Sequence, residues 1–201
     1  MNPSFWNGRF SSTEYAYGTE PNVFLKEQIE RLEPGKILFP AEGEGRNAVF
    51  AASLGWDVTA FDFSIAAKAK ALMLAARKGV HIEYLTGTFE SLGLADEMYD
   101  CVAICWAHLP PGFRPIFHQF AQNVLKEDGV IIIEGFAKDQ LGRYSGGPKH
   151  PDMLFSVEEL QEDFEDLGEF TVDEKLVILS EGTYHQGEAA VVRLVGKKCS
   201  C

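Results

Sequence analysis

The stretch Lys36-Ile-Leu-Phe-Pro-Ala-Glu-Gly-Glu-Gly-Arg-Asn47, followed by Asp57-Val-Thr-Ala-Phe-Asp62, decides the fold of this chain. It predicts a buried strand, a glycine turn that opens a helix, and a second strand that ends in an acid. Gly43 and Gly45 can take backbone angles closed to other residues, so a ligand can approach the main chain there. Asp62, about 20 residues past the glycines, is where an acid accepts hydrogen bonds from two ribose hydroxyls in Rossmann-like sites. The unit therefore predicts a nucleotide pocket.

The glycine turn favours one kind of ligand. The helix beginning near Arg46 is expected to point its unpaired N–H groups and the positive end of its dipole at the ligand. A dinucleotide fingerprint reads G-x-G-x-x-G, whereas this turn has no third glycine and carries Glu42 and Glu44. Two carboxylates would repel a pyrophosphate but tolerate or attract the sulfonium and amino group of S-adenosylmethionine. The alternative is a tight turn with two solvated glutamates, and the flanking strands favour ligand binding over it.

Length and charge bound the class of protein. The 201 residues suffice for one domain with a substantial core, and the apolar fraction of 46% is ordinary for a globular protein. The net charge of −12 argues against a nucleic-acid partner, because binding phosphates requires a basic surface. No apolar run approaches the roughly 18 residues that span a bilayer, and the N-terminus lacks a signal-peptide core. We expect a single domain over residues 1–201, a cytoplasmic location and no membrane partner.

The four cysteines indicate no metal site. Cys101 and Cys105 fall on one expected strand, where even spacing puts both on the same face as small buried side chains. Cys199 and Cys201 end the chain as Cys-Ser-Cys, which is expected to be a reduced tail. Metal binding or redox chemistry would need a third ligand that the sequence near this tail does not supply.

Apolar periodicity and turn residues alternate strands with helices along most of the chain. The expected strands are 36–39, 57–61, 81–85, 99–105 and 130–134, and the expected helices are 21–32, 46–54, 64–78, 112–125 and 156–166. The alternation predicts a parallel sheet with helices on both sides. Residues 171–179 and 189–195 are joined by a segment too short for a helical crossover, so they must pair as a hairpin. The sequence thus predicts a three-layer, Rossmann-like α/β fold with a mostly parallel seven-stranded sheet and an antiparallel C-terminal hairpin, the layout of class I methyltransferases.

Two further segments are expected to cover the site. Residues 1–18 are rich in aromatic side chains, which a disordered tail would not carry, so they cover either the core or a bound ligand. We treat 1–18 as an N-terminal cover and 19–201 as the Rossmann-like core. The loop 137–154 contains three glycines, which suits a mobile lid.

Six motifs occur in order along nearly the whole chain: Trp6-Asn-Gly-Arg-Phe10, Tyr17-Gly-Thr-Glu-Pro-Asn22, Ala41-Glu-Gly-Glu-Gly-Arg-Asn47, Val58-Thr-Ala-Phe-Asp-Phe-Ser64, His108-Leu-Pro-Pro111 and Gly182-Thr-Tyr-His-Gln-Gly187. In these motifs the chain resembles bacterial class I S-adenosylmethionine-dependent methyltransferases of the tellurite-resistance and thiopurine-methyltransferase-like group. The resemblance implies S-adenosyl-L-methionine as methyl donor, S-adenosyl-L-homocysteine as product, and a small-molecule acceptor with a thiol, selenium or tellurium nucleophile. It leaves open whether the protein is a monomer or a dimer.

The resemblance also implies roles for individual residues. Glu42, Gly43 and Gly45 would contact the methionine part of the cofactor. Asp62 would hold the ribose hydroxyls, and Phe63 would pack on the adenine. Thr88 stands where related enzymes usually carry an acid, so its hydroxyl and the Phe89 backbone N–H would recognise the adenine amino group. The other cofactor-binding residues expected from the motifs are Trp6, Arg9, Phe10, Tyr17, Asn47 and Trp106.

The acceptor site is expected just beyond the strand 99–105. Methyl transfer is an in-line displacement, so the enzyme must align and desolvate a nucleophile and sometimes remove a proton. His108 or Arg114 would orient the acceptor or help to deprotonate it, and Arg114 matches an arginine that follows a proline turn in thiopurine methyltransferases. The alternative for His108 is a side chain that caps a helix or braces a loop. For Tyr184 and His185 a structural role at the hairpin tip is favoured over chemistry.

Two other functions compete with a methyltransferase. A non-catalytic protein could keep the S-adenosylmethionine pocket for regulation, although the intact glycine turn and aromatic N-terminus disfavour it. A nicotinamide-dependent oxidoreductase is opposed by the missing third glycine and by the C-terminal hairpin.

Overall fold

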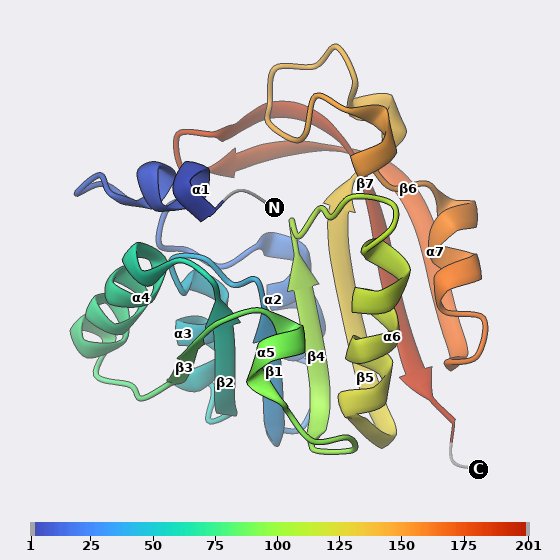
Figure 1. Cartoon of the computed structure of the whole chain (residues 1–201), viewed down its shortest axis with the longest axis horizontal. Helices are drawn as coiled ribbons and strands as arrows, with labels where there is room; N and C mark the ends of the chain where they lie inside the picture. The colour runs from blue at the N-terminus through green and yellow to red at the C-terminus, as the bar shows by residue number, and fades with distance from the viewer. Residues whose placement is uncertain (1–2, 200–201) are drawn as a thin grey trace.

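The computed structural model describes residues 3–199, so Cys201 of the terminal Cys-Ser-Cys lies outside the described residues. Its sheet has the strand order β3-β2-β1-β4-β5-β7-β6 (Figure 1). The strands are β1 (Lys36–Pro40), β2 (Asp57–Asp62), β3 (Glu83–Thr86), β4 (Tyr99–Cys105), β5 (Leu125–Phe136), β6 (Gly168–Glu181) and β7 (His185–Lys198). The first five pair in parallel, and β7 pairs antiparallel with both β5 and β6. The predicted α/β fold with a C-terminal hairpin is confirmed.

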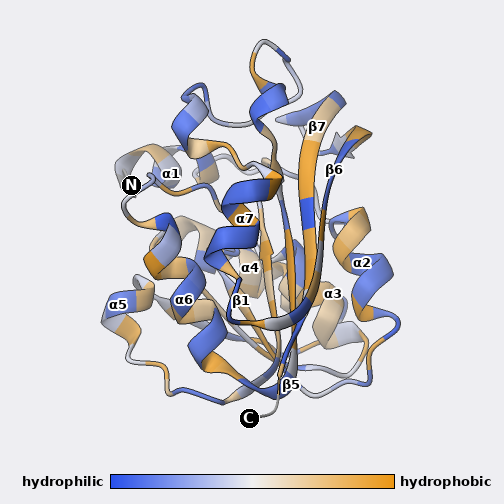
Figure 2. Cartoon of the chain, turned by 90° about the vertical axis from the view of Figure 1, so that its right-hand side faces the viewer, coloured by the Kyte–Doolittle hydropathy of each residue, from blue (hydrophilic) through white to orange (hydrophobic). Residues whose placement is uncertain are grey.

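Helices cover both faces of this sheet, as Figure 2 shows from the side. The helices are α1 (Pro3–Phe10), α2 (Val23–Ile29), α3 (Arg46–Ser53), α4 (Ile65–Lys78), α5 (Phe89–Leu92), α6 (Arg114–Val124) and α7 (Val157–Asp163), with short 3₁₀ turns at Lys138–Gln140 and Pro151–Met153. Apolar residues of α2, α3 and α4 share one core with the sheet, and those of α5, α6 and α7 share the other. The strands between them are apolar on both sides, as expected of buried parallel strands.

Several helix ends lie where the sequence predicts them. Ser64 accepts a hydrogen bond from the Ala67 N–H to begin α4, and Gly79 ends it with a φ of 69°. Ser156 and Glu159 form a reciprocal capping box that begins α7. These ends follow from bonds within one turn of chain, which is why the local sequence suffices to predict them.

Other elements depart from the predictions. The aromatic N-terminus forms α1, and Thr88 begins the short helix α5, neither of which the apolar pattern indicates. The strand expected at 130–134 begins earlier, at Leu125, because the chain already pairs with Tyr99 there before the register shifts. The hairpin is also longer than predicted, with only residues 182–184 between β6 and β7. Pairing across the sheet sets the ends of these strands, and the local sequence carries no signal of that pairing.

The functional edge of the sheet lies at the carboxyl ends of β1 and β4, where the chain order reverses. Two non-glycine residues there have positive φ: Ala41 at 53° after β1, and Trp106 at 62° after β4. Such angles cost about 1–3 kcal/mol each and concentrate at functional sites. The backbone is therefore strained where the fold would place a ligand.

Three further observations concern membrane-spanning helices, metal-ligand clusters and the cysteines of β4. Within residues 3–199, no helix is long and apolar enough to cross a membrane. The same residues contain no cluster of three or more His, Cys, Asp or Glu side chains that could hold a metal ion. Cys101 and Cys105 are free thiols on β4, with Cys101 fully buried.

Candidate active site

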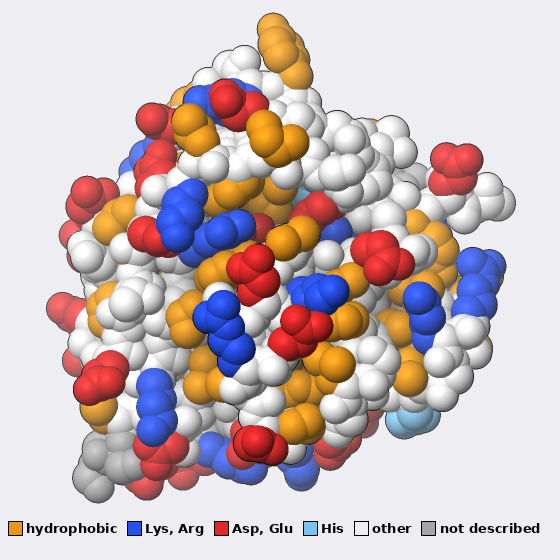
Figure 3. Space-filling view, turned by 180° about the vertical axis from the view of Figure 1, so that it is seen from behind, with side chains coloured by type: hydrophobic (Ala, Val, Ile, Leu, Met, Phe, Trp, Pro, Cys, Tyr) orange, Lys and Arg blue, Asp and Glu red, His pale blue; other side chains and the backbone are white. Residues whose placement is uncertain are grey.

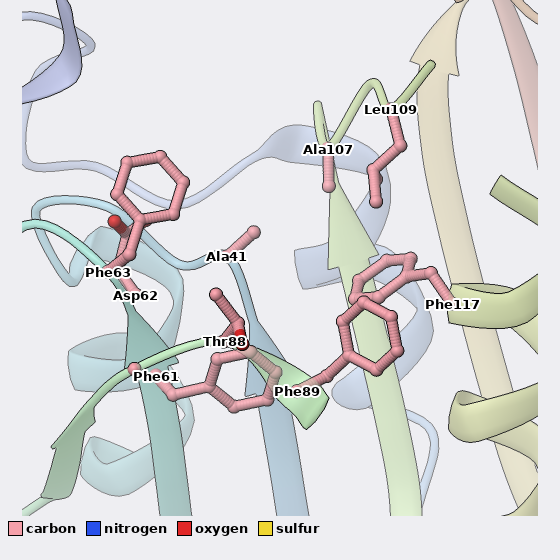
Figure 4. Close-up of a pocket in the computed structure, with 10 residues that line it drawn as sticks. Ala41, Phe61, Asp62, Phe63, Thr88, Phe89, Ala107, Leu109 and Phe117 are labelled. Atoms are coloured by element: carbon pink, nitrogen blue, oxygen red, sulfur yellow. The ribbon is translucent and has the colours of Figure 1, made fainter. Parts of the chain in front are cut away.

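A narrow cavity of about 40 Å³ opens at this edge of the sheet (Figure 4). Its walls come from the segments that follow four neighbouring strands and from α6. The lining residues are Ala41, Phe61, Asp62, Phe63, Gly87, Thr88, Phe89, Ala107, Leu109 and Phe117. Four of the predicted cofactor-binding residues are therefore brought together here: Asp62, Phe63, Thr88 and Phe89. Sequence reasoning missed Ala107, Leu109 and Phe117, because an apolar residue that lines a ligand cavity has the same sequence pattern as one in the core.

Asp62 is the charged group of this cavity. Its Oδ1 accepts a hydrogen bond from the Ser64 N–H at 2.8 Å, and its Oδ2 accepts one from the Gly43 N–H at 3.2 Å. Burial raises the pKa of the Asp62 carboxyl, and the backbone N–H groups oppose that shift. Each oxygen has further lone-pair capacity toward the cavity, since a carboxylate can accept about four hydrogen bonds.

These residues fit S-adenosylmethionine. The buried carboxylate of Asp62 supplies acceptors for a pair of ribose hydroxyls, and the apolar walls, among them Phe61 and Leu109, suit a flat adenine ring. The cavity is nevertheless much smaller than the roughly 300 Å³ at which small-molecule pockets begin. We infer that the segment covering the glycine turn must shift for the whole cofactor to enter.

The glycines of the turn have different roles. A Cβ on Gly45 would lie 2.5 Å from the Cβ of Ala71, so Gly45 is needed for the close packing of the turn on α4. A Cβ on Gly43 would lie 3.3 Å from the Phe10 ring, so the cover occupies the space above this glycine. That both glycines admit a ligand to the main chain stays a prediction. Both have positive φ, at 65° and 86°.

Both glutamates of the turn have protein partners, and Glu42 is half-buried whereas Glu44 is buried. Glu42 Oε1 accepts hydrogen bonds from the Asn47 and Ala48 N–H groups, both at 2.9 Å. These are N–H groups of the first turn of α3, so the expectation that they point at a ligand is wrong for this state of the protein. Burial raises the pKa of Glu42 to about 7. Glu44 is buried in an ion pair with Lys70 and accepts the Ala16 N–H at 2.8 Å.

The N-terminal helix α1 lies across the carboxyl edge of the sheet (Figure 1). Trp6 stacks on Phe10 with ring centroids 5.4 Å apart, and Phe10 meets Tyr17 edge-on at 6.5 Å. The Arg9 Nη1 donates to the Tyr17 hydroxyl at 3.3 Å, and its guanidinium lies 3.7 Å from the centre of the Tyr184 ring. The predicted residues of this segment thus form one aromatic cover over the glycine turn.

Polar contacts fasten the cover to the core. Lys70 of α4 donates to the Ser12 carbonyl at 3.0 Å, besides its ion pair with Glu44. Asn47 Oδ1 accepts the Asn22 N–H at 2.9 Å, so this predicted cofactor ligand instead holds the chain where it leaves the cover. Asn47 is buried and lines neither described cavity, so its contact with a cofactor stays a prediction.

Glu181 is a buried centre of polar contacts that the sequence did not single out. Its Oε2 accepts from Arg46 at 2.7 Å and from the Trp106 indole N–H at 3.1 Å, and its Oε1 accepts from the Asn22 amide at 3.1 Å. His185 lies 3.4 Å from the same Oε2. Burial raises the pKa of the Glu181 carboxyl, but His185 and Arg46 outweigh burial and lower the pKa to about 2, so Glu181 is ionised. The only sequence signal was its place immediately before the hairpin motif.

His108 does not face an acceptor. Its Nδ1 lies 2.7 Å from the Met153 carbonyl oxygen, and its Nε2 accepts the Phe136 N–H at 3.0 Å. Both ring nitrogens are therefore used, and burial lowers the pKa of the imidazole to about 4. The catalytic assignment is corrected: His108 braces the loop after β5, which was the alternative considered.

Arg114 does not face the cavity either. Its Nε donates to Asp163 Oδ2 at 2.8 Å, and its Nη1 pairs with Glu159 at 3.1 Å. Both acids lie on α7, so the buried guanidinium joins α6 to α7. The sequence placed Arg114 correctly at the start of α6, but the direction of its side chain depends on a helix about 45 residues away. Its catalytic assignment is also corrected.

Fold and site together define a class of protein. The strand order, the antiparallel last hairpin and the acid that ends β2 are the class I methyltransferase arrangement. Residues 37–129 match the family model described as a methyltransferase domain, and this segment contains most of β1, all of β2 to β4, and the start of β5. Residues 37–129 are thus similar to a methyltransferase domain, and the chain shares its fold with proteins described as S-adenosylmethionine-dependent methyltransferases.

Solved structures share this fold at low sequence identity. A protein studied for the conversion of a disulfide bond into a thioacetal group during echinomycin biosynthesis has a TM-score of 0.74 and 16% identity, over 98% of this chain and 91% of that one. TehB from Haemophilus influenzae has a TM-score of 0.72 and 16% identity, over 98% of this chain and 66% of that one. An S-adenosylmethionine-dependent methyltransferase from Methanosarcina mazei has a TM-score of 0.69 and 19% identity, over 90% of this chain and 99% of that one. No curated protein sequence matches this chain.

Proposed function

We propose that this protein transfers the methyl group of S-adenosylmethionine to a small molecule through a thiol, selenium or tellurium nucleophile. The observation that carries the proposal is the cavity at the carboxyl ends of β1 and β4, with Asp62 at one end and Ala107 and Leu109 at the other. Asp62 binds the ribose, and Phe63 and Leu109 enclose the adenine. An acceptor then approaches from the side of Trp106, beyond the end of β4.

The cover supports a small acceptor. Trp6, Phe10 and Tyr17 close over the glycine turn and would exclude water from a bound cofactor. The bound cofactor supplies an electrophilic methyl group on a sulfonium. The chain's part is to orient the nucleophile in line with that methyl group and to remove its hydration shell. A large polymer would have to displace the cover, which favours a small acceptor.

Charge and chemistry favour a soft, small nucleophile. On the face shown in Figure 3, basic side chains are interspersed with acidic and apolar ones, and no extended basic patch is seen there. Together with the net charge of −12, this disfavours a nucleic-acid acceptor. The protein studied for the conversion of a disulfide bond into a thioacetal group shares this fold, which makes sulfur nucleophiles the first acceptors to test.

An acceptor screen tests the proposal. The protein is incubated with S-adenosylmethionine and separate panels of alkyl thiols, aryl thiols, selenite, tellurite, amines, RNA and peptides, and release of S-adenosylhomocysteine is measured. We expect turnover on thiols or on selenium or tellurium species to exceed that on all other panels. Turnover only on RNA or peptides would overturn the acceptor class. Tight cofactor binding without turnover on any panel would favour the non-catalytic alternative.

A further inference from the structure

The strand β6 forms one edge of the sheet. It pairs with β7 over all of Gly168–Glu181, and no other strand within residues 3–199 pairs with its outer side. In an antiparallel pair, every second residue directs its N–H and C=O away from the neighbouring strand. β6 therefore presents a row of unpaired backbone groups along its 14 residues. Figure 2 looks onto this edge, with α7 to one side of β6 and α2 to the other.

The features that commonly protect an edge strand are missing from β6. Natural edges are blunted by short strands, prolines, bulges or inward-pointing charges. β6 contains no proline, and its pairing with β7 runs through without a register shift. The strand at the opposite edge of the sheet, β3, has only 4 residues. Of the two edges, β6 is the one long and regular enough to pair with a further strand.

One face of β6 carries apolar side chains that its own chain leaves exposed. Leu176 and Ile178 are 61% and 76% exposed. Phe170 and Val172 point to the same face, because side chains alternate along a strand, and they are half-buried against the core that α7 covers. The four side chains form an apolar stripe that continues from this core onto the surface. Such a stripe on an unprotected edge marks a site of interaction with another chain.

Charges on the other face of β6 indicate what that chain is. Asp173 and Lys175 form an ion pair at 2.7 Å, and both side chains are about half exposed. Consider a second copy of β6 placed antiparallel, with Glu174 of both copies on the two-fold axis. Asp173 of each copy then lies opposite Lys175 of the other, so four charges alternate in sign on this face. Opposite charges in facing positions of neighbouring strands stabilise a sheet.

The same register matches the apolar stripe to itself. Val172 of each copy lies opposite Leu176 of the other, and Phe170 lies opposite Ile178. The exposed half of the stripe in one copy is thereby covered by the half-buried half in the other. Moving the axis by one residue along β6 would place like charges opposite each other on the other face. The apolar and the charged face therefore agree on one register.

Glu174 is the residue that opposes this register, because its two copies meet on the axis. Burial raises the pKa of the Glu174 carboxyl, and so do Asp139, in the 3₁₀ turn after β5, and Glu158 of α7. Protonation of Glu174 removes the repulsion between the two copies. Pairing of the two strands should therefore strengthen as pH falls.

We propose that β6 pairs antiparallel with β6 of a second copy of this chain, about a two-fold axis at Glu174, so that one continuous sheet runs through both protomers. A second cavity, of about 380 Å³, lies between residues 17–23 and the C-terminal hairpin, with Ile178 and Ser180 in its wall. In this register the second copy's strand runs past both residues, so the interface lies beside this cavity. The cavity at Asp62 lies several strands away from β6 and stays clear of the interface.

Sedimentation equilibrium across the micromolar range measures the pairing. The wild type should be a dimer, and Ile178→Lys should raise its dissociation constant at least about 100-fold, because each copy then places a charge opposite Phe170 of the other. Ile65→Lys is the matched control, since Ile65 on α4 is 70% exposed and far from β6 in the fold; its dissociation constant should be unchanged. Glu174→Gln should tighten the dimer at least about tenfold at pH 7 and remove its pH dependence. A wild type that is monomeric throughout this range at pH 6 and pH 7 would overturn the proposal.

A cross-link tests the register. Cys199 is exposed, so Cys199→Ser with Cys201→Ser is the background for each variant. Residues directly opposite each other have Cβ atoms about 4.5–5.5 Å apart, close to the span of a disulfide. Glu174→Cys should therefore form a covalent dimer on mild oxidation. Leu176→Cys should not, because its twin lies four positions further along the second strand.

Two results would contradict the account of this interface. A covalent dimer from Leu176→Cys but none from Glu174→Cys would overturn the register at Glu174. A dimer that survives Ile178→Lys and gives no cross-link at either position would place the contact elsewhere and overturn the pairing of β6 altogether.

Discussion

Two backbone N–H groups hold the Asp62 carboxylate in place before any ligand arrives, since Gly43 and Ser64 each donate one hydrogen bond to it. Such preorganisation lets a binding site gain affinity without reordering its own groups. Glu42, two residues after β1, has the opposite character, because burial raises its pKa to about 7 and leaves it about half protonated at pH 7. One acid of the site is thus set to accept bonds from ligand hydroxyls, and the other is set to change its charge.

Asp62→Ala should weaken S-adenosylmethionine binding at least tenfold, because hydrogen bonds to a charged acceptor contribute roughly 1.5–3 kcal/mol. The measurement is calorimetric titration, with thermal unfolding as the check on folding and the exposed Asp166→Ala as control. Asp62→Asn keeps one carbonyl acceptor, so its affinity for S-adenosylmethionine should lie between those of the wild type and Asp62→Ala. An unchanged affinity in folded Asp62→Ala would remove this residue from the site.

Glu42 predicts a pH effect on stability. Its pKa of about 7 in the folded protein lies above the usual value of 4.5, so the folded state binds the proton more tightly than the unfolded state. Stability from this group is therefore present at low pH and is lost as pH rises from about 4.5 to about 7. Glu42→Gln should flatten that part of the curve of unfolding free energy against pH. If wild type and variant keep the same pH dependence, Glu42 is not buried as described.

At the scale of elements, the hairpin and the cover meet at two glycines. A Cβ on Gly182 would lie 2.4 Å from the Gly18 nitrogen and the Tyr17 carbonyl carbon, both backbone atoms that cannot yield. The turn between β6 and β7 is therefore shaped to receive the chain that leaves the cover. The Thr183 N–H also donates to the Ala16 carbonyl at 3.0 Å, which continues this contact.

Gly182→Ala should lower the free energy of unfolding by at least about 2 kcal/mol more than Gly93→Ala. Both glycines have positive φ, at 64° and 57°, so both variants bear the left-handed penalty of about 1–2 kcal/mol. Only Gly182 meets backbone, since nothing lies within 4 Å of a Cβ on Gly93. Denaturant unfolding of the two variants measures the difference. Equal losses would show that the hairpin turn and the cover do not touch.

Deleting residues 1–17 should spare cooperative unfolding of the sheet but sharply reduce cofactor affinity. The cover packs over Gly43 and excludes water from the crevice, whereas the apolar cores beneath it are formed by β1 to β7 and α2 to α7. Titration of the truncated protein with S-adenosylhomocysteine, and hydrogen exchange of α1 with and without that ligand, give two readings. Full affinity after deletion would make the cover an ordinary part of the packing.

Across the whole molecule, the local sequence predicts elements whose deciding contacts are local, but it does not predict the direction of side chains that bind distant segments. Ser64, Gly79 and the apolar run of β4 predicted their elements because the deciding contacts are local or the strand is buried on both faces. The site was predicted as far as the strand ends, which placed Asp62 and Phe63. The directions of His108 and Arg114 were wrong, because a loop and a helix about 45 residues further along the chain bind those side chains.

The central claim is that one cofactor binds at the carboxyl ends of β1 and β4, with its ribose at Asp62 and its sulfur directed toward Trp106. A crystal structure of the protein with S-adenosylhomocysteine tests it most directly. The account predicts ribose hydroxyls within hydrogen-bond distance of the Asp62 carboxylate, adenine between Phe63 and Leu109, and the cover shifted from its place above Gly43. A ligand bound elsewhere, or a ribose that makes no contact with Asp62, would contradict it.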